Sequence, residues 1–290
     1  MELIRTIAEA HDLVEKIRLS GRLIGLVPTM GALHRGHLLL VDEIRDHVDV
    51  IIMSIFVNPL QFGPNEDFDR YPRTLDSDVE LAETVGVDYI FCPDVSEMYA
   101  GNVKTRVVVA DLPNHLCGLS RPGHFDGVTT VVTKLINILK PHIAIFGQKD
   151  MQQAIIIQKM VKDLSLDVKI MTLPTVREVD GLAMSSRNNF LSEADRHEAV
   201  KLFQSLNFAK QMIVTGERDL FLIVEGIKNF ITTGNSAEID YIGLVDTETL
   251  EDLTELKDGS SVLIALAVKF GKTRLIDNLT IKIPVFEHVV

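Results

Sequence analysis

Two histidines separated by three positions, His34 and His37, are the residues in this sequence best placed to do chemistry. They flank Gly36 in the segment PTMGALHRGH, residues 28–37, which also contains Gly31. Two imidazoles at this spacing can face one bound triphosphate, where their N–H groups stabilise charge that builds on the phosphates during displacement. The glycines permit close approach of the backbone to such a ligand. The alternatives are an exposed loop with incidental histidines, or a metal site, although no third or fourth ligand follows at zinc-like spacing.

Two neutral amides come next along the chain, Asn58 and Gln61 in the segment VNPLQF. A side-chain amide offers both donors and an acceptor, which suits recognition of a hydroxylated substrate. The alternative is that both residues cap the turn around Pro59. The sequence leaves the two interpretations open.

A later segment, FGQKD at residues 146–150, combines backbone freedom with charge. Gly147 allows backbone approach, Lys149 supplies a positive charge and Asp150 can bind a ribose hydroxyl. The segment follows an apolar, strand-like run, so it is expected at the carboxyl end of a strand. A surface Lys–Asp pair is the alternative.

The segment MSSRN, residues 184–188, combines the hydroxyls of Ser185 and Ser186 with the guanidinium of Arg187. These groups suit the β- and γ-phosphates of a nucleotide. A mobile loop of this kind could close over the nucleotide and exclude water from a reactive intermediate. The alternative is a polar linker between domains.

Three further residues are candidates for the walls of the site. Arg121 in SRPGHFDG is a candidate anion contact, and a structural arginine is the alternative. Tyr71 and Arg73 in RYPRT are expected to line the pocket without a chemical role.

The elements that must position these residues alternate between strand and helix. Residues 50–57 form an apolar run without polar alternation, the pattern of a strand buried on both faces of a parallel sheet. The predicted strands are residues 22–27, 50–57, 88–92 and 142–146, and the predicted helices run from residue 36 onward and over residues 74–86, 127–139 and 150–162. This order predicts a doubly wound α/β sheet, which binds ligands at the carboxyl ends of its strands.

The pattern changes near residue 175, where helices precede strands instead of alternating with them. Such grouping indicates a smaller α+β domain. The amphipathic segments are residues 192–215 and 217–233, and the strand-like runs are residues 238–245 and 261–270. We therefore expect a Rossmann-like domain over residues 1–178 and a smaller domain over residues 179–290 that closes over the site.

The composition excludes several classes of protein. The chain is 46% apolar and 24% charged with a formal net charge of −12, so we expect no nucleic-acid partner. No apolar run approaches the ~18 residues of a membrane helix, and the start lacks the apolar core of a signal peptide. We therefore expect a cytoplasmic protein with no membrane contact, in which Cys92 and Cys117 stay reduced.

The pattern HxGH after a first strand resembles the signature of the nucleotidyl-transferase superfamily, whose members release pyrophosphate from a nucleotide. Within that group, the chain resembles the pantothenate synthetase (pantoate–β-alanine ligase) family from about residue 20 to 191. The motifs occur in the family's order: PTMGALHRGHLLLVDE, SIFVNPLQFGPNEDFDRYPRTLDSD, SRPGHFDGV, IFGQKDMQQ, PTVREVDGLAMSSRN and the C-terminal RLIDN. Two positions depart from the commoner pattern, with Gln148 in place of Glu and Met151 in place of an aromatic residue.

The resemblance implies ATP-dependent condensation of pantoate with β-alanine through a pantoyl adenylate, with release of AMP and pyrophosphate. It implies that His34, His37 and Lys149 are catalytic, with His37 also a candidate proton donor. The expected ATP contacts are Met30, Gly31, His34, Gly36, His37, Gly147, Gln148, Lys149, Asp150, Val176, Met184, Ser185, Ser186 and Arg187. The expected contacts with pantoate and β-alanine are Gln61, Gln153, Asn58 and Arg121. Mg²⁺ is expected with the phosphates, although the sequence does not identify its protein ligands, and a homodimer is expected through the first domain.

Other functions make different demands on the sequence. A nucleotidyltransferase that stops at a dinucleotide-like product would share HxGH but lack the pairing of VNPLQF with FGQKDMQQ. A nucleotide sensor without turnover would have lost His34, His37 or Lys149, and all three are present. An aminoacyl-tRNA synthetase is disfavoured by the acidity and by a C-terminal part too short for an anticodon domain.

Overall fold

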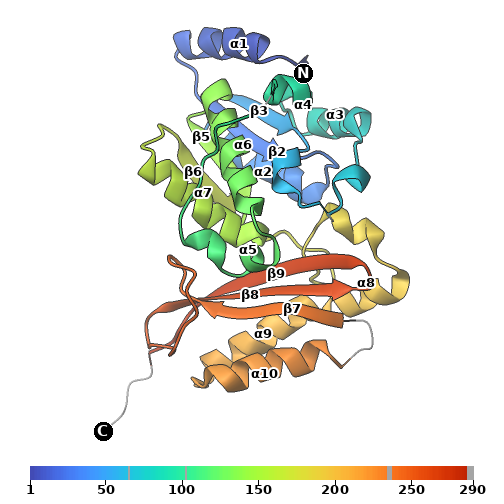
Figure 1. The fold of residues 1–290 in the computed structure, drawn as a ribbon, viewed down its shortest axis with the longest axis vertical. Helices are drawn as coiled ribbons and strands as arrows, with labels where there is room; N and C mark the ends of the chain where they lie inside the picture. Colours follow the sequence, from blue (N-terminus) through green and yellow to red (C-terminus); the bar gives the residue numbers. More distant parts are fainter. Residues whose placement is uncertain (65, 102, 234–236, 286–290) are drawn as a thin grey trace. The chain divides into compact units, whose positions relative to one another are not determined.

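The computed structural model describes residues 1–290 except residues 65, 102, 234–236 and 286–290, and the chain divides into two compact units (Figure 1). The first unit comprises Met1–Pro113, Arg121–Gln148 and Gln153–Pro174, and the second comprises Asn114–Ser120, Lys149–Gln152 and Thr175–Val290. Within the described ranges, no helix is both long and apolar enough to cross a membrane.

Six parallel strands form the sheet of the first unit, in the order β1-β4-β3-β2-β5-β6 (Figure 1). Their bounds are β1 Glu2–Ile4, β2 Ile24–Thr29, β3 Val50–Ile55, β4 Tyr89–Phe91, β5 Ile143–Gly147 and β6 Lys169–Leu173. Strands β3 and β5 lie on opposite sides of β2, so the strand order reverses there. In an open α/β sheet, the ligand crevice lies at the carboxyl ends of the strands at such a switch point. Here those are the ends of β2 and β5.

Helices cover both faces of this sheet, as the apolar runs predict. Neighbouring residues of β3 enter different core clusters: Ile52 packs in a cluster with α1, α6 and α7, and Met53 packs in another with α2 and α3. The helices are α1 Ile7–Leu19, α2 Arg35–Arg45, α3 Leu75–Thr84, α4 Val95–Met98, α6 His124–Leu139 and α7 Met151–Asp163. Because both Ile52 and Met53 are fully buried, the predicted doubly wound sheet is confirmed.

The second unit contains an antiparallel sheet of β7 Ala237–Val245, β8 Ser261–Phe270 and β9 Thr273–Lys282, in that order. Its helices are α5 Cys117–Ser120, α8 Glu193–Ala199, α9 Lys201–Val214 and α10 Leu220–Ile231. Leu206 of α9 and Ile227 of α10 pack in one core cluster with Leu266 of β8. This arrangement confirms a smaller C-terminal α+β fold.

Short 3₁₀ helices occur in the loops: η1 Pro59–Gln61, η2 Phe68–Arg70, η3 Leu112–Asn114, η4 Gln148–Asp150 and η5 Ser186–Phe190. The predicted elements lie within a few residues of their observed bounds, with two kinds of difference. The long helix expected over residues 192–215 is two helices, because the Val200 N–H bonds to Glu198 O and interrupts the helical hydrogen-bond pattern. Strands β1, β6 and β9 were not predicted, since β1 has three residues, β6 is partly exposed and β9 carries polar residues among its apolar ones.

Candidate functional site

His34 and His37 cap the N-terminus of α2 with their side chains. His34 is the N-cap residue, and its Nδ1 accepts a hydrogen bond from the Gly36 N–H at 3.1 Å. His37 Nδ1 accepts one from the His34 N–H at 3.3 Å, and the two ring centroids are 4.0 Å apart. A neutral imidazole whose Nδ1 accepts carries its proton on Nε2. In their neutral forms both rings would therefore present an Nε2–H at a helix terminus whose dipole favours anions.

Asp78 fixes the loop before α2, and it was not among the residues predicted from the sequence. Its carboxylate is buried and accepts hydrogen bonds from the Leu33 N–H at 2.7 Å, the Ala32 N–H at 3.0 Å and the Thr74 hydroxyl at 3.2 Å. Gly31 has a φ of +80°, and a Cβ there would lie 2.9 Å from Asp78 Oδ2. Gly31 thus makes room for the carboxylate that fixes the loop. One feature of the sequence could have pointed to Asp78: it is an acidic residue in the first turn of the helix predicted over residues 74–86.

Asn58 and Gln61 lie at the two ends of η1, and their amides contact each other. Asn58 Nδ2 donates to Gln61 Oε1 at 3.0 Å and to Gly127 O at 3.1 Å. Asn58 Oδ1 accepts from the Tyr99 hydroxyl at 2.8 Å, and it also caps η1. Gln61 Nε2 lies 3.3 Å from Met30 Sδ. Asn58 therefore caps the turn, as one of its two interpretations predicts, and it orients the Gln61 amide at the same time.

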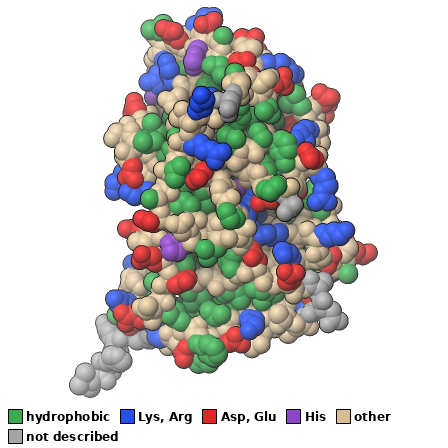
Figure 2. Space-filling model, in the orientation of Figure 1, with side chains coloured by type: hydrophobic (Ala, Val, Ile, Leu, Met, Phe, Trp, Pro, Cys, Tyr) green, Lys and Arg blue, Asp and Glu red, His purple; other side chains and the backbone are tan. Residues whose placement is uncertain are grey.

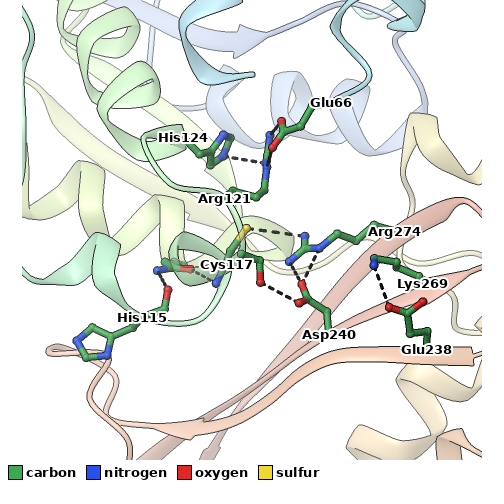
Figure 3. Close-up of polar contacts among 11 residues, drawn as sticks. Glu66, His115, Cys117, Arg121, His124, Glu238, Asp240, Lys269 and Arg274 are labelled. Carbon is green, nitrogen blue, oxygen red and sulfur yellow. Dashed lines mark hydrogen bonds and ion pairs between the residues drawn. The ribbon is translucent and has the colours of Figure 1, made fainter. Parts of the chain in front are cut away.

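Arg121 contacts the backbone of the same glutamine, and its guanidinium pairs with Glu66 and lies beside His124 (Figure 3). Its Nε donates to Glu66 Oε1 at 2.8 Å, and its Nη2 donates to Gln61 O at 3.2 Å. His124 Nδ1 lies 2.7 Å from the same carbonyl oxygen. Burial alone would raise the pKa of Glu66, but the hydrogen bond and charge of Arg121 outweigh it and hold that pKa below the ordinary value of 4.5. Arg121 thus makes the structural contacts that its alternative interpretation predicts.

Helix α6 approaches η1 so closely that only glycine fits at the contact. A Cβ built at Gly127 would lie 2.3 Å from Leu60 O and 2.5 Å from Gln61 N. Any side chain at this position would displace η1, and Gln61 with it. The glycine in the motif SRPGHFDGV therefore has a packing role that the sequence did not specify.

Three other predicted residues of the first unit lie in three different segments. Gly147 ends β5, and a Cβ built there would meet no protein atom within 4 Å. Gln153 is half-buried in the first turn of α7. Tyr71 packs edge-on against Phe62 with centroids 5.9 Å apart, in the loop that carries Glu66.

Lys149 belongs to the second unit, and its side chain is only 19% exposed. Its Nζ lies 3.9 Å from Asp150 Oδ2, and Asp150 is 48% exposed. Lysine side chains are seldom so buried unless they are paired. The 3.9 Å separation is at the limit of an ion pair, which suits a lysine whose stronger partner is a ligand.

A β-hairpin leads into the predicted phosphate loop. The Met184 N–H donates to Val176 O at 2.9 Å, and Gly181 in the turn has a φ of +97°. The hairpin ends at Ser185, whose Oγ accepts from the Arg187 N–H at 3.3 Å and caps η5. The predicted phosphate loop is therefore a capped turn that follows a hairpin.

Polar contacts fix α5 to the sheet of the second unit (Figure 3). Arg274 donates to Asp240 Oδ2 at 2.9 and 2.7 Å, and the Ser120 hydroxyl donates to Asp240 Oδ1 at 2.9 Å. The Cys117 N–H donates to Gln152 Oε1 at 3.0 Å. The amide of Gln152 therefore has a structural role. The predicted substrate contact is the next residue, Gln153.

Within the first unit, predicted residues form two groups. His34 lies beside His37, and Asn58, Arg121 and Met30 lie around Gln61. Over the described ranges, no three His, Cys, Asp or Glu side chains gather in a group that could hold a metal ion. Acidic and basic side chains are interspersed on the face drawn in Figure 2.

The chain is similar to known proteins over nearly its whole length. A family model described as Pantoate-beta-alanine ligase matches residues 2–280. A pantothenate synthetase of Acetivibrio thermocellus is 55% identical, over 98% of this chain and 100% of the relative. A solved pantothenate synthetase of Thermus thermophilus is 40% identical with a TM-score of 0.90, over 96% of this chain and 99% of that one. The pantoate-beta-alanine ligase of Francisella tularensis, solved in complex with beta-gamma ATP and β-alanine, is 35% identical with a TM-score of 0.79, over 96% and 97%.

Proposed function

The chain belongs to the pantoate-beta-alanine ligase family, and from that premise we propose how its residues carry out the ATP-dependent ligation of pantoate to β-alanine. In the first step the pantoate carboxylate attacks the α-phosphate of ATP, pyrophosphate leaves and pantoyl adenylate forms. In the second step the amine of β-alanine attacks the acyl carbon and AMP leaves. Because the substrate supplies the nucleophile, the protein contributes positioning and charge stabilisation.

The observation that carries the proposal is the pair of imidazole Nε2–H donors at the N-terminus of α2. His34 and His37 donate to phosphate oxygens of ATP as negative charge moves onto the departing pyrophosphate. Their Nδ1 atoms are already used by backbone N–H groups, so each ring is oriented before ATP arrives. The open position at Gly147 supports a close approach of the β5 backbone to the nucleotide.

The second group of ATP contacts is cationic and hydroxylic. Lys149 and Arg187 neutralise the β- and γ-phosphates, and Ser185 and Ser186 donate hydroxyl hydrogen bonds to them. The low exposure of Lys149 supports this role, because a desolvated ammonium gains from an anionic ligand. The further ATP contacts are Met30, Gly31, Gly36, Gln148, Asp150, Val176 and Met184.

Pantoate is held by the amides of Gln61 and Gln153. Asn58 and Arg121 act through Gln61, since the first hydrogen-bonds its side chain and the second its backbone carbonyl. The sequence predicts that all four residues contact the substrates, whereas this proposal keeps only the two glutamines as direct contacts. An oriented amide loses less conformational freedom when it binds a hydroxyl group than a mobile one does.

The remaining parts of the proposal concern the metal, assembly and location. Mg²⁺ would be held mainly by the phosphates of bound ATP, where it would neutralise part of their charge. The enzyme acts in the cytoplasm as a homodimer formed through the domain of residues 1–178. The domain of residues 179–290 closes over bound ATP and keeps water from the adenylate.

Isotope transfer tests the chemistry directly. Pantoate labelled with ¹⁸O in its carboxylate is incubated with ATP, Mg²⁺ and β-alanine, and the products are analysed by mass spectrometry. One carboxylate oxygen bridges to phosphorus in the adenylate, and cleavage of the acyl carbon–oxygen bond leaves it on AMP. We expect one label in AMP per turnover, with pyrophosphate formed in equal amount. Label in inorganic phosphate, or unlabelled AMP, would overturn the acyl-adenylate route.

A further inference from the structure

The C-terminal motif RLIDN, residues 274–278, has no assigned part in the reaction, although Arg274 contacts Asp240 and the sulfur of Cys117 in α5. It lies on β9, and two consecutive residues of it, Asp277 and Asn278, are buried. Each of the two makes a polar contact with a different segment of the second unit. Both segments contain residues proposed to meet the triphosphate of ATP.

Asp277 forms a bidentate ion pair with Arg177. Arg177 Nη1 lies 2.6 Å from Asp277 Oδ2 and Nη2 lies 3.0 Å from Oδ1, and the aspartate side chain is 0% exposed. Burial raises the pKa of Asp277, and the hydrogen bonds and charge of Arg177 oppose that shift. A bidentate ion pair of this kind fixes the two backbone segments that carry it relative to each other, because separating them would leave a buried charge without a partner.

Arg177 is part of the hairpin that leads to Ser185. It forms a β-bridge with Ala183, and its Nη1 also donates to Gly181 O at 3.1 Å. Its guanidinium carbon lies 3.8 Å from the centroid of the Phe203 ring. The hairpin is therefore fixed to β9 through its first strand, which pairs with the strand that leads into the predicted phosphate loop.

Asn278 connects β9 to the second segment. Its backbone N–H donates to Asp277 Oδ1 at 2.8 Å, and its Nδ2 donates to Lys149 O at 2.9 Å. The charge of Lys149 also acts on the Asp277 carboxylate. Two neighbouring residues of β9 thus reach the Lys149 backbone and the base of the hairpin together.

We propose that Asp277 and Asn278 are positioning residues for adenylate formation: through Arg177 and the Lys149 carbonyl, they hold the hairpin before Ser185 and the Lys149 backbone in one fixed relation. The proposal rests on the proposed function, in which Lys149 and the Ser185–Arg187 segment contact ATP. It assigns a role to the RLIDN motif. A displacement of about 1 Å in such groups costs up to about 10²-fold in rate.

The test separates the two half-reactions. Pantoate-dependent exchange of pyrophosphate into ATP reports adenylate formation, and reaction of enzyme-bound pantoyl adenylate with β-alanine reports the second step. We expect Asn278→Ala to slow the exchange about 10- to 100-fold, while the second step stays within about twofold. Asn278→Asp keeps the shape of the side chain but loses the donor, so it should slow the exchange at least as much. Thr280→Ala, an exposed position on the same strand, is the control and should leave both steps unchanged.

Asp277→Asn weakens the ion pair and should also slow the exchange selectively, but it risks unfolding. The Asn278 variants keep the test decisive because they leave the Arg177–Asp277 pair intact. Equal slowing of both half-reactions would show a merely structural role, and normal exchange by Asn278→Asp would show that the hydrogen bond to Lys149 O is not needed. Either result would overturn the proposal.

Lys149→Ala and Arg187→Ala, measured in parallel, separate a failure of the positioning role from a failure of the proposed ATP contacts. If both lose the exchange while the Asn278 variants retain it, the positioning proposal alone is wrong. If Lys149→Ala and Arg187→Ala retain it, the assignment of these residues to ATP is wrong.

Discussion

His34 and His37 show how a helix cap can set the protonation of a functional residue. Each Nδ1 accepts a backbone N–H at the start of α2, so a neutral ring must donate through Nε2. Protonation of Nδ1 would break the cap. The hydrogen bonds that begin the helix are therefore the ones that prepare the two donors, and capping can be separated from donation by choice of substitution.

The first prediction uses asparagine in place of His34. Asparagine is a strong N-cap residue, so His34→Asn should keep the cap and the thermal stability, whereas His34→Ala should lose ~0.5–2 kcal/mol of stability. Both variants lack the Nε2–H donor, and both should slow adenylate formation by about 10²–10³-fold. Rapid-quench measurement of pyrophosphate release, with Tm by calorimetry, checks the two effects. Near-normal release by His34→Asn would show that the ring matters only as a cap.

A second prediction compares two glycines of the first unit. Gly127→Ala places a methyl group against Leu60 O and should lower stability by ~1–3 kcal/mol and raise KM for pantoate by displacing Gln61. Gly147→Ala meets open space, so its stability should stay within ~0.5 kcal/mol while KM for ATP rises about 10-fold or more. Denaturant titration and steady-state kinetics on both substrates check this. An unchanged KM for ATP in Gly147→Ala would show that the nucleotide does not bind against Gly147.

At the scale of elements, η1 is a three-residue helix held by its neighbours. Asn58 caps it, α6 packs against it at Gly127, and Arg121 bonds the carbonyl of its last residue, Gln61. A single 3₁₀ turn has few hydrogen bonds of its own. Its position is therefore determined by tertiary contacts. The Glu66–Arg121 pair and the His124 ring beside Gln61 O are titratable parts of them.

A third prediction follows from the lowered pKa of Glu66. A carboxyl group whose folded-state pKa lies below its unfolded value stabilises the fold above the unfolded value and loses that contribution as pH falls through the folded one. Glu66→Gln should therefore lower Tm by about 1–3 °C at neutral pH. The difference from the unsubstituted protein should close below about pH 4.5. Calorimetry from about pH 3 to 7 measures it, with Glu80→Gln on α3 as the control, and a difference that persists at the acidic end would contradict the assignment.

At the scale of the whole molecule, the net charge influences which ligands the protein can bind. A formal net charge of −12 repels polyanions. ATP and pantoate are also anions, so their binding depends on local groups such as the imidazoles of α2 and the Lys149 ammonium. The overall field opposes binding of large anions and leaves small ones to these sites.

A fourth prediction concerns nucleic acids. Neither duplex DNA nor tRNA should bind at physiological salt, because the protein has no net positive charge to release counterions from a phosphate backbone. Fluorescence anisotropy with labelled tRNA, repeated at low and physiological salt, checks this, and a basic tRNA-binding protein serves as the positive control. Tight, salt-sensitive binding would revive the aminoacyl-tRNA synthetase alternative.

The sequence by itself was enough for the sheet class and, through the family that its motifs resemble, for the reaction, and it supplied the candidate site residues as predictions. Residues 50–57 predict a two-sided buried strand because a parallel strand covered by helices has no polar face, and β3 confirms it. The HxGH segment predicts phosphate chemistry because imidazole donors and a helix N-terminus both favour anions. The strand is confirmed because its local pattern fixes it, and the role of the HxGH segment stays a prediction that rests on residue type.

Only the tertiary structure decided how those residues are held. Asp78 reaches the loop before α2 from 45 positions away, and Asn278 reaches Lys149 across 129. Arg121, which composition and spacing left as either an anion contact or a structural residue, bonds the carbonyl of Gln61. Contacts of this kind depend on which side chains the fold brings together, and hydrophobic periodicity carries no information about partners so distant in the chain. The motifs could therefore be located from the sequence, whereas the residues that fix their geometry had to be found in the fold.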